Sequence, residues 1–174
     1  MVCGIFGGVA DFALFALLPI YGLQHGLDQA ATLVTLSVFI GGNVLLQIPI
    51  GWIADHVSRR AMLLVCILAT LTGALLLPFA VSVGFWLDIL VFFLGGSTFA
   101  IYTLGLGLLG DGFPRAQLAA ANVALVMVYE MGAAGGPTLA GTAMDLVGPE
   151  GLVAVVALAS LALLAAFFRL RPRV

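Results

Sequence analysis

The stretch GWIADHVSRRAML, residues 51–63, separates two long apolar segments of this chain. It is short and polar, and it contains Asp55 and the adjacent arginines Arg59 and Arg60. A helix needs about 20 apolar residues to cross the hydrocarbon core of a bilayer, and the segments on both sides reach that length. We therefore predict that residues 51–63 form a turn at the membrane surface between two antiparallel transmembrane helices.

The composition of the whole chain is that of a membrane protein. Of its 174 residues, 63% are hydrophobic and 8% are charged, whereas soluble domains carry about 25% charged residues. The net charge of −2 gives no indication of a nucleic-acid partner. Cys3 and Cys66 form no CxxC pair, and the two histidines lie in predicted loops on opposite membrane faces, so we predict no metal site and no cofactor. The expected environment is the lipid bilayer.

Hydropathy predicts an all-α integral membrane fold, with residues 1–174 forming a single six-helix bundle. The connections between the apolar runs are short, so consecutive helices are expected to be antiparallel neighbours. The predicted transmembrane runs are 1–23, 29–53, 61–80, 85–110, 117–143 and 151–170.

All arginines fall on one side of this predicted topology, and lysine is absent. They follow the second, fourth and sixth runs: Arg59, Arg60, Arg115, Arg169, Arg171 and Arg173. Basic residues are enriched on the cytoplasmic side of membrane proteins. This pattern predicts a multi-pass protein of the bacterial cytoplasmic (inner) membrane with both termini in the cytoplasm.

The second and fifth runs end alike, which indicates an internal repeat. The sequence Gly51-x-x-x-Asp55 closes the second run, and Gly141-x-x-x-Asp145 closes the fifth. The two runs also share an upstream proline and an upstream glycine pair, namely Pro49 and Pro137, and Gly41-Gly42 and Gly135-Gly136. Two three-helix repeats of inverted topology are common in transporters. Because Gly-x-x-x-Asp also arises by chance, two unrelated helix ends are the alternative.

Residues 51–63 resemble the loop signature of the major facilitator superfamily, G-x-L-A-D-[RK]-x-G-R-[RK]-x-x-L. The matching positions are Gly51, Ala54, Asp55, Arg59, Arg60 and Leu63, and the departures are His56 and Ser58. The resemblance implies a gating loop, formed by Gly51, Asp55, Arg59 and Arg60, that holds helix bundles in one state until a ligand shifts the balance. An ordinary basic turn after a helix would explain the arginines but not the whole spacing.

Other stretches resemble the YcaD-type branch of this superfamily, among them residues 17–22 and 111–115. The glycine-proline stretch in the fifth run is similar to one in a superfamily fifth or eleventh helix, and is expected to pack closely and permit a bend through Gly132, Gly135, Gly136, Pro137 and Gly141. Members of the superfamily normally have twelve helices in two halves. The resemblance therefore implies one half, the C-terminal one because run 85–110 lacks arginine. Its partner would be a second six-helix half, from the same gene product or a separate one; a self-associating six-helix protein is the alternative.

Two acidic residues lie near the middle of predicted helices, Asp11 in the first run and Glu130 in the fifth. An ionisable group at that depth costs about 2.5–3.5 kcal/mol on insertion scales, so it is a functional candidate. The resemblance places Asp11 on the substrate path, where it would exchange protons; the alternative is a carboxyl group that only joins two helices. The further candidates for substrate contact are Tyr102 and the amides of Asn43, Gln47 and Asn122, and the amides could instead bind neighbouring helices.

These features predict a transmembrane transporter of a small molecule. Proton-coupled, efflux-type secondary transport by alternating access is the expected form. An enzyme is not expected, because no run contains a nucleophile with a base, or a metal-binding cluster. A channel-like or structural membrane subunit without transport activity is the alternative, although it would not require the signature in residues 51–63.

Overall fold

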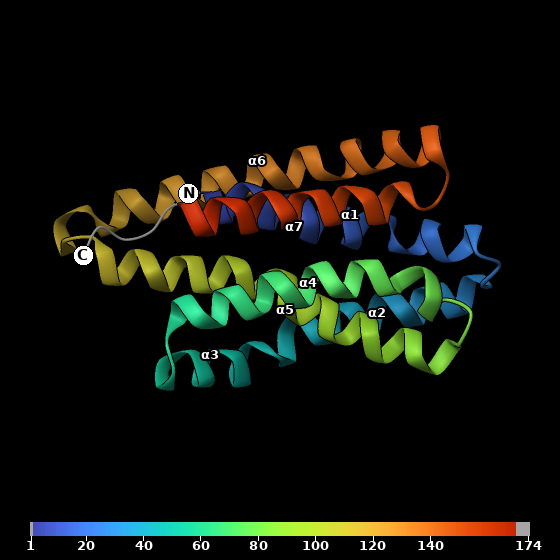
Figure 1. Cartoon of the computed structure of the whole chain (residues 1–174), viewed down its shortest axis with the longest axis horizontal. Coiled ribbons are helices and arrows are strands. Elements are labelled where there is room, and N and C mark those ends of the chain that lie inside the picture. The colour runs from blue at the N-terminus through green and yellow to red at the C-terminus, as the bar shows by residue number, and fades with distance from the viewer. Residues whose placement is uncertain (1, 170–174) are drawn as a thin grey trace.

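The computed structural model describes residues 2–169, and within that range the chain is all-helical. The helices run along one elongated bundle (Figure 1). They are α1 (Val2–Gln24), α2 (Gln29–Leu45), α3 (Gln47–His56), α4 (Arg59–Ala80), α5 (Gly84–Gly112), α6 (Arg115–Val147) and α7 (Gly151–Arg169). With α2 and α3 counted as one segment, six segments are long and apolar enough to cross a membrane. The predicted fold class is confirmed, and α6 extends furthest beyond its predicted run.

The second predicted run, 29–53, is not one continuous helix, because it breaks at Leu46. Pro49 has no N–H to donate to the Leu45 carbonyl, and its ring crowds that carbonyl. Helical backbone hydrogen bonds persist on both sides of the break: the Leu46 N–H donates to the Gly42 carbonyl at 3.1 Å, and the Ile50 N–H donates to the Leu46 carbonyl at 3.0 Å. By contrast, Pro137 lies inside α6, which stays continuous. The chain therefore breaks near the proline of the second run, whereas α6 continues past Pro137, and the bend at Pro137 stays a prediction.

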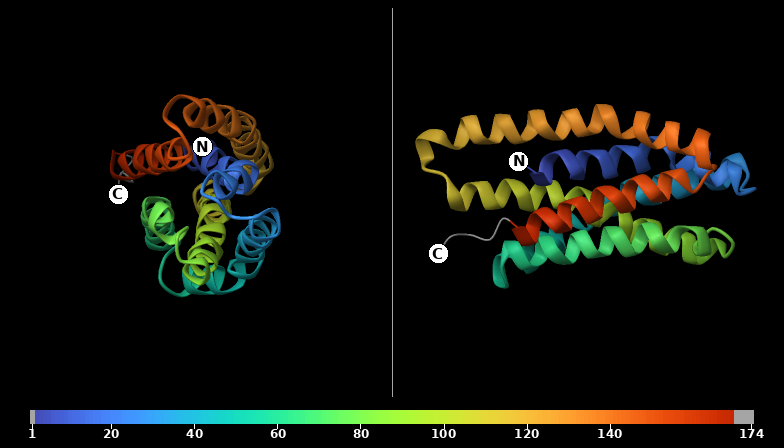
Figure 2. Two further views of the ribbon diagram at one scale, coloured as in Figure 1. Left: turned by 90° about the vertical axis from the view of Figure 1, so that its right-hand side faces the viewer. Right: turned by 45° about the horizontal axis from the view of Figure 1, so that its top comes forward.

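The packing of the helices has a two-fold pattern. Helix α1 packs against α6 as α5 packs against α2, and α1 packs against α7 as α5 packs against α4. The first three membrane segments (α1, α2 with α3, and α4) therefore correspond in order to the last three (α5, α6 and α7), and corresponding helices pack against corresponding neighbours. Seen from its end, the bundle places α1 and α5 at its centre (Figure 2). This is the arrangement expected of two inverted three-helix repeats.

Glycines at equivalent positions of the two repeats make the closest helix contacts. Each lies so near a carbonyl oxygen of the facing helix that an added Cβ would overlap that oxygen. The pairs of glycine and carbonyl are Gly8 with Tyr129, Gly132 with Ile5, Gly95 with Phe39 and Gly42 with Phe92. The first two pairs join α1 to α6, and the other two join α5 to α2.

These contacts correct the register of the sequence repeat. Gly42 takes the position in α2 that Gly132 takes in α6. These two glycines are as far apart in the sequence as Gly51 and Gly141. The sequence pattern had instead matched the pair Gly41-Gly42 to the pair Gly135-Gly136. Gly136 packs closely against Val9 of α1. At Gly135 and Gly141, no described atom from outside their own helix segment lies within 4 Å of where an added Cβ would be.

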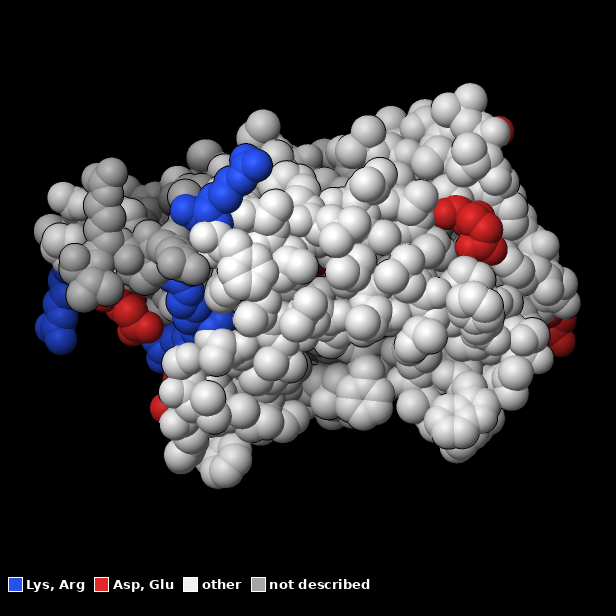
Figure 3. Space-filling view, in the orientation of Figure 1, with Lys and Arg blue, Asp and Glu red and all other residues white. Residues whose placement is uncertain are grey.

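Charged side chains lie mainly at the two ends of the bundle. Figure 3 shows the blue arginine side chains at one end of the visible face with acidic groups beside them, further acidic groups toward the other end, and a broad, almost wholly uncharged surface between. Arg59 and Arg115 begin helices at this end, Arg60 follows Arg59, and Arg169 ends a helix there; Arg171 and Arg173 lie outside the described residues. Large apolar side chains such as Ile48 and Phe93 are exposed between the ends, as expected for a multi-pass membrane protein.

Candidate functional site

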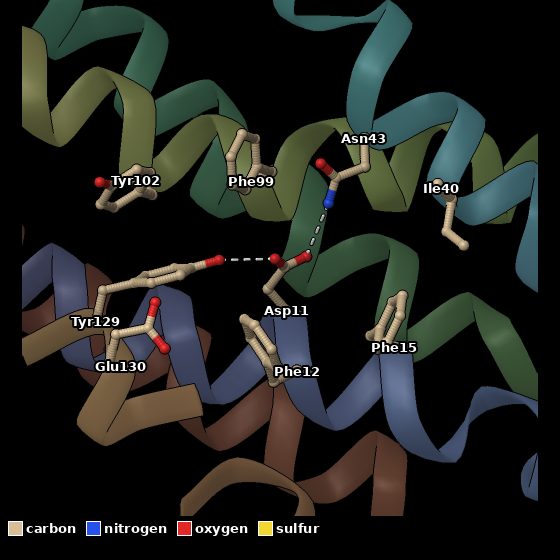
Figure 4. A pocket seen from close by; sticks show the side chains of 9 residues that line it. All are labelled: Asp11, Phe12, Phe15, Ile40, Asn43, Phe99, Tyr102, Tyr129 and Glu130. Atoms are coloured by element: carbon tan, nitrogen blue, oxygen red, sulfur yellow. Dashed lines mark hydrogen bonds between the residues drawn. The ribbon is translucent and has the colours of Figure 1, made fainter. Parts of the chain in front are cut away.

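Asp11 is the buried acid at the centre of the bundle, with 5% of its surface exposed. Three side chains from three other helices donate hydrogen bonds to it. The Tyr129 hydroxyl of α6 reaches Oδ2 at 2.8 Å, while the Thr98 hydroxyl of α5 and the Asn43 amide of α2 reach Oδ1 at 2.9 and 3.2 Å. Figure 4 shows the bonds from Tyr129 and Asn43. One carboxyl group on α1 is thus joined to α2, α5 and α6.

The close glycine contacts explain why these donors reach Asp11. Tyr129 is the residue whose backbone lies against Gly8, about one turn before Asp11. Asn43 follows Gly42, and Thr98 lies about one turn after Gly95, so the α2–α5 contact holds both donors near α1. Small residues in α1, α2 and α5 therefore position the polar cluster.

Thr98 allows Asp11 to bind or release a proton without rearrangement of the heavy atoms. The Thr98 hydroxyl lies 2.9 Å from Asp11 Oδ1 and 3.0 Å from the Gly95 carbonyl oxygen. A hydroxyl carries one proton and two lone pairs. It donates to Asp11 when the carboxyl group is ionised. When Asp11 is protonated, it donates to the hydroxyl oxygen, and Thr98 donates to Gly95 instead.

A cavity of about 390 Å³ opens beside Asp11. Its walls come from α1, α2, α5 and α6, and most of its side chains are aromatic (Figure 4). The lining residues are Asp11, Phe12, Phe15, Ile40, Asn43, Phe99, Tyr102, Tyr129 and Glu130. The structure thus brings four of the predicted candidates together: Asp11, Asn43, Tyr102 and Glu130.

Glu130 differs from Asp11 in its surroundings. It is exposed, and it makes no hydrogen bond or ion pair with any residue that the structure describes. Figure 4 shows its carboxylate beside the ring of Tyr129, which precedes it on α6. The cavity therefore contains one fully bonded acid and one acid without a partner among the described residues.

Gln47 and Asn122 do not line this cavity. The Gln47 amide donates to the carbonyls of Asn43 and Gly96 at 2.9 and 3.3 Å, and its oxygen accepts from Thr103 at 3.1 Å. Gln47 therefore joins the α2–α3 break to α5. Asn122 is partly exposed nearer the start of α6, and it forms no hydrogen bond within residues 2–169.

The predicted gating loop forms a charged cluster at the arginine end. Arg59 donates to Asp55 at 3.1 Å, to Asp111 at 2.9 Å and to the Gly107 carbonyl at 3.1 Å. Because these partners lie on α3 and α5, Arg59 joins both helices to the start of α4. By contrast, a Cβ added at Gly51 would have no described atom from outside its own helix segment within 4 Å.

Arg60 extends this cluster toward α7. Its guanidinium group donates to the Phe167 carbonyl at 3.2 Å and lies 4.7 Å from the centre of the Phe167 ring. Such a contact of a cation with an aromatic face is attractive. The turn between α3 and α4 is therefore held by side-chain contacts to two other helices.

Comparison with known proteins identifies the family. The family model described as Major Facilitator Superfamily matches residues 1–174. The chain belongs to the major facilitator superfamily. The resemblance carried by residues 51–63 is thereby confirmed, and the six membrane segments agree with half of a superfamily fold.

Relatives of this superfamily chain are also called MFS-type transporters. An uncharacterized MFS-type transporter of Yersinia enterocolitica is 27% identical over 141 residues, covering 81% of this chain and 36% of the relative. For YfkF of Bacillus subtilis the identity is 29% over 146 residues, or 79% and 35% of the two chains. For YcaD of Salmonella paratyphi B it is 27% over 143 residues, or 81% and 36%. The chain spans about a third of the length of these relatives, and no solved structure matches it.

Sequence reasoning missed three polar partners in this superfamily chain. Thr98 and Tyr129 bind Asp11, and Asp111 binds Arg59. The signal for Asp111 was its place on the same membrane side as Arg59. For Thr98 and Tyr129 the available signal was only that both are polar residues inside apolar runs.

Proposed function

We propose that this chain is one six-helix half of a secondary transporter, which moves a small molecule across the bacterial cytoplasmic membrane in exchange for protons. Asp11 is the proton-carrying group. The observation that carries this proposal is the place of Asp11, a carboxyl group that is buried in a membrane helix, accepts hydrogen bonds from three other helices and lines the cavity.

The proposed coupling is electrostatic. In the ionised state Asp11 adds a negative charge to a cavity with largely apolar walls, and protonation removes that charge. The affinity for a ligand that interacts with this charge then changes with protonation. A change of charge at a point where α1, α2, α5 and α6 meet also shifts the balance between arrangements of these helices.

The exposure of Glu130 supports the proposal that a second six-helix half faces the cavity. A carboxylate near the middle of a membrane helix is strongly disfavoured against lipid and normally faces protein or water. The cavity face therefore borders a water-filled path between two halves. The relatives, of which this chain covers about a third, are long enough to supply such a second half. That the chain corresponds to the C-terminal half stays a prediction.

The arginine end is the proposed cytoplasmic side, by the distribution of basic residues. There the side chains of Asp55 and Asp111 are 63% and 61% exposed although both bind Arg59. Carboxylates with remaining free surface are suited to meet a helix N-terminus, which carries partial positive charge. The gating proposal is that this cluster contacts the second half in one state and separates from it in the other.

The experiment uses the full-length natural protein in sealed vesicles that contain a pH-sensitive dye. A cationic, a neutral and an anionic aromatic compound are added in turn, and proton movement is recorded. Transport predicts proton movement coupled to at least one class, and Asp11→Asn should abolish it while counterflow of that compound continues. Intact pH-driven movement in Asp11→Asn would disprove the role of Asp11. No response to any class in the natural protein would favour the channel-like or structural subunit.

A further inference from the structure

The walls of the Asp11 cavity combine acidic and aromatic side chains. Asp11 and Glu130 line it, and none of its lining residues is basic. The arginines that the structure describes lie in the first or last turn of a helix, and Arg59 is already bound to two carboxylates. In a cavity with apolar walls such charges act over a longer range than in water. This wall of the cavity therefore contributes negative charge and no positive charge, which favours a cationic ligand over an anionic one.

The two acids are suited to different tasks. The oxygens of Asp11 receive bonds from Tyr129, Thr98 and Asn43, so this carboxyl group lies behind its own protein partners. Glu130 has no partner among the described residues and is exposed. Glu130 is therefore the carboxylate that is free to pair with a charged ligand.

The aromatic rings favour the rest of such a ligand. Phe12 and Phe15 extend from α1, and Phe99 and Tyr102 extend from α5, on two sides of the cavity (Figure 4). The ring of Tyr102 lies 4.5 Å from that of Tyr129, which continues the aromatic wall toward Glu130. Aromatic faces attract cations and also bury flat apolar groups. The volume of about 390 Å³ lies within the range of about 300–1,000 Å³ common for small-molecule sites.

We infer that this cavity binds a monovalent organic cation with an aromatic body, and that Glu130 supplies the counter-charge. The inference rests on the proposed transport function and names its substrate class. The organic cation and the proton would then occupy the same negatively charged cavity in alternation. Exchange of a cation for a proton requires this alternation.

Binding of tetraphenylphosphonium to the full-length protein in detergent tests this inference directly. Tetraphenylborate has nearly the same shape and the opposite charge, so it is the matched competitor. We expect tetraphenylphosphonium to bind, tetraphenylborate to compete poorly, and Glu130→Gln to weaken cation binding at least about tenfold. Asp145→Asn is the control, because it removes one negative charge from the same helix at an exposed position that does not line the cavity.

Three results would overturn the inference. They are no binding of tetraphenylphosphonium by the natural protein, equal competition by tetraphenylborate, and unchanged cation binding in a folded Glu130→Gln variant. The vesicle experiment separates this failure from failure of the transport proposal. Proton exchange with only the neutral or anionic compound would exclude the cation class and keep transport. Cation binding through Glu130 without proton-coupled movement would keep the site and exclude the transport function.

Discussion

The Tyr129 hydroxyl donates to Oδ2 of Asp11 at 2.8 Å, and this bond joins α6 to α1 in the interior of the bundle. The backbone carbonyl of Tyr129 also lies against Gly8 of α1. The same residue therefore contributes a steric contact and a polar contact to one helix pair. The close approach at Gly8 is what brings the hydroxyl within reach of the carboxyl group.

Replacing Tyr129 with phenylalanine should destabilise the protein. The ring and its packing remain, but Asp11 loses one donor while still buried, and such a loss costs about 1–3 kcal/mol. Thermal unfolding of the full-length protein in detergent measures this effect. Tyr102→Phe is the matched control, because the Tyr102 hydroxyl has no hydrogen bond within the described residues and should change the unfolding temperature little. Equal unfolding temperatures for the two variants would contradict the assignment.

Thr98→Val should impair proton coupling more than folding. Valine keeps the shape of threonine but removes the group that accepts the Asp11 proton in one state and donates to Asp11 in the other. In the vesicle experiment we expect the dependence of transport on the pH gradient to be reduced or lost. Thr98→Ser should restore it, since serine keeps the hydroxyl. A Thr98→Val variant with natural pH-driven movement would show that Thr98 has no part in proton exchange.

The six membrane segments and the acidic residues in the middle of helices were predictable from sequence, whereas the contacts between helices were not. Runs of apolar residues determine the six segments, and an acidic residue in the middle of a run is visible without a structure. The partners of Asp11 depend on which faces of α2, α5 and α6 turn toward α1. That choice depends on packing at Gly8, Gly42 and Gly95, which are only three of 22 glycines in the chain.

The broken second segment shows the same limit. Pro19, Pro78 and Pro137 also lie inside predicted runs, yet α1, α4 and α6 remain continuous around them. At the α2–α3 break, the Gln47 side chain donates to the Asn43 carbonyl and to Gly96 of α5. Such bonds satisfy backbone groups at a helix interruption inside a membrane. Because they involve a second helix, the proline alone did not identify the break.

Alanine at Gly132 should be far less tolerated than alanine at Gly141, although both residues lie on α6. A Cβ at position 132 would overlap the Ile5 carbonyl and push α6 away from α1, whereas position 141 is open. At an open position in a helix interior, alanine is favoured over glycine by about 0.5–1 kcal/mol. We expect a lower unfolding temperature for Gly132→Ala and an unchanged or higher one for Gly141→Ala. The reverse order would contradict the close α1–α6 contact.

Arg59→Lys should loosen the turn between α3 and α4 even though the charge is kept. The planar guanidinium group binds Asp55 through one nitrogen, and Asp111 and the Gly107 carbonyl through another. A lysine ammonium is a compact charge that lacks this forked geometry. Hydrogen exchange of the full-length protein, read by mass spectrometry, should therefore become faster in residues 51–60.

Arg115→Lys is the control for this exchange experiment. Arg115 also begins a helix at the arginine end, but it makes no hydrogen bond or ion pair with another residue in 2–169. Its replacement should leave exchange in residues 51–60 unchanged. Unchanged exchange in Arg59→Lys would mean that the lysine ammonium binds Asp55 and Asp111 as well as arginine does. The forked geometry of Arg59 would then not be what holds α3 and α5 to the start of α4.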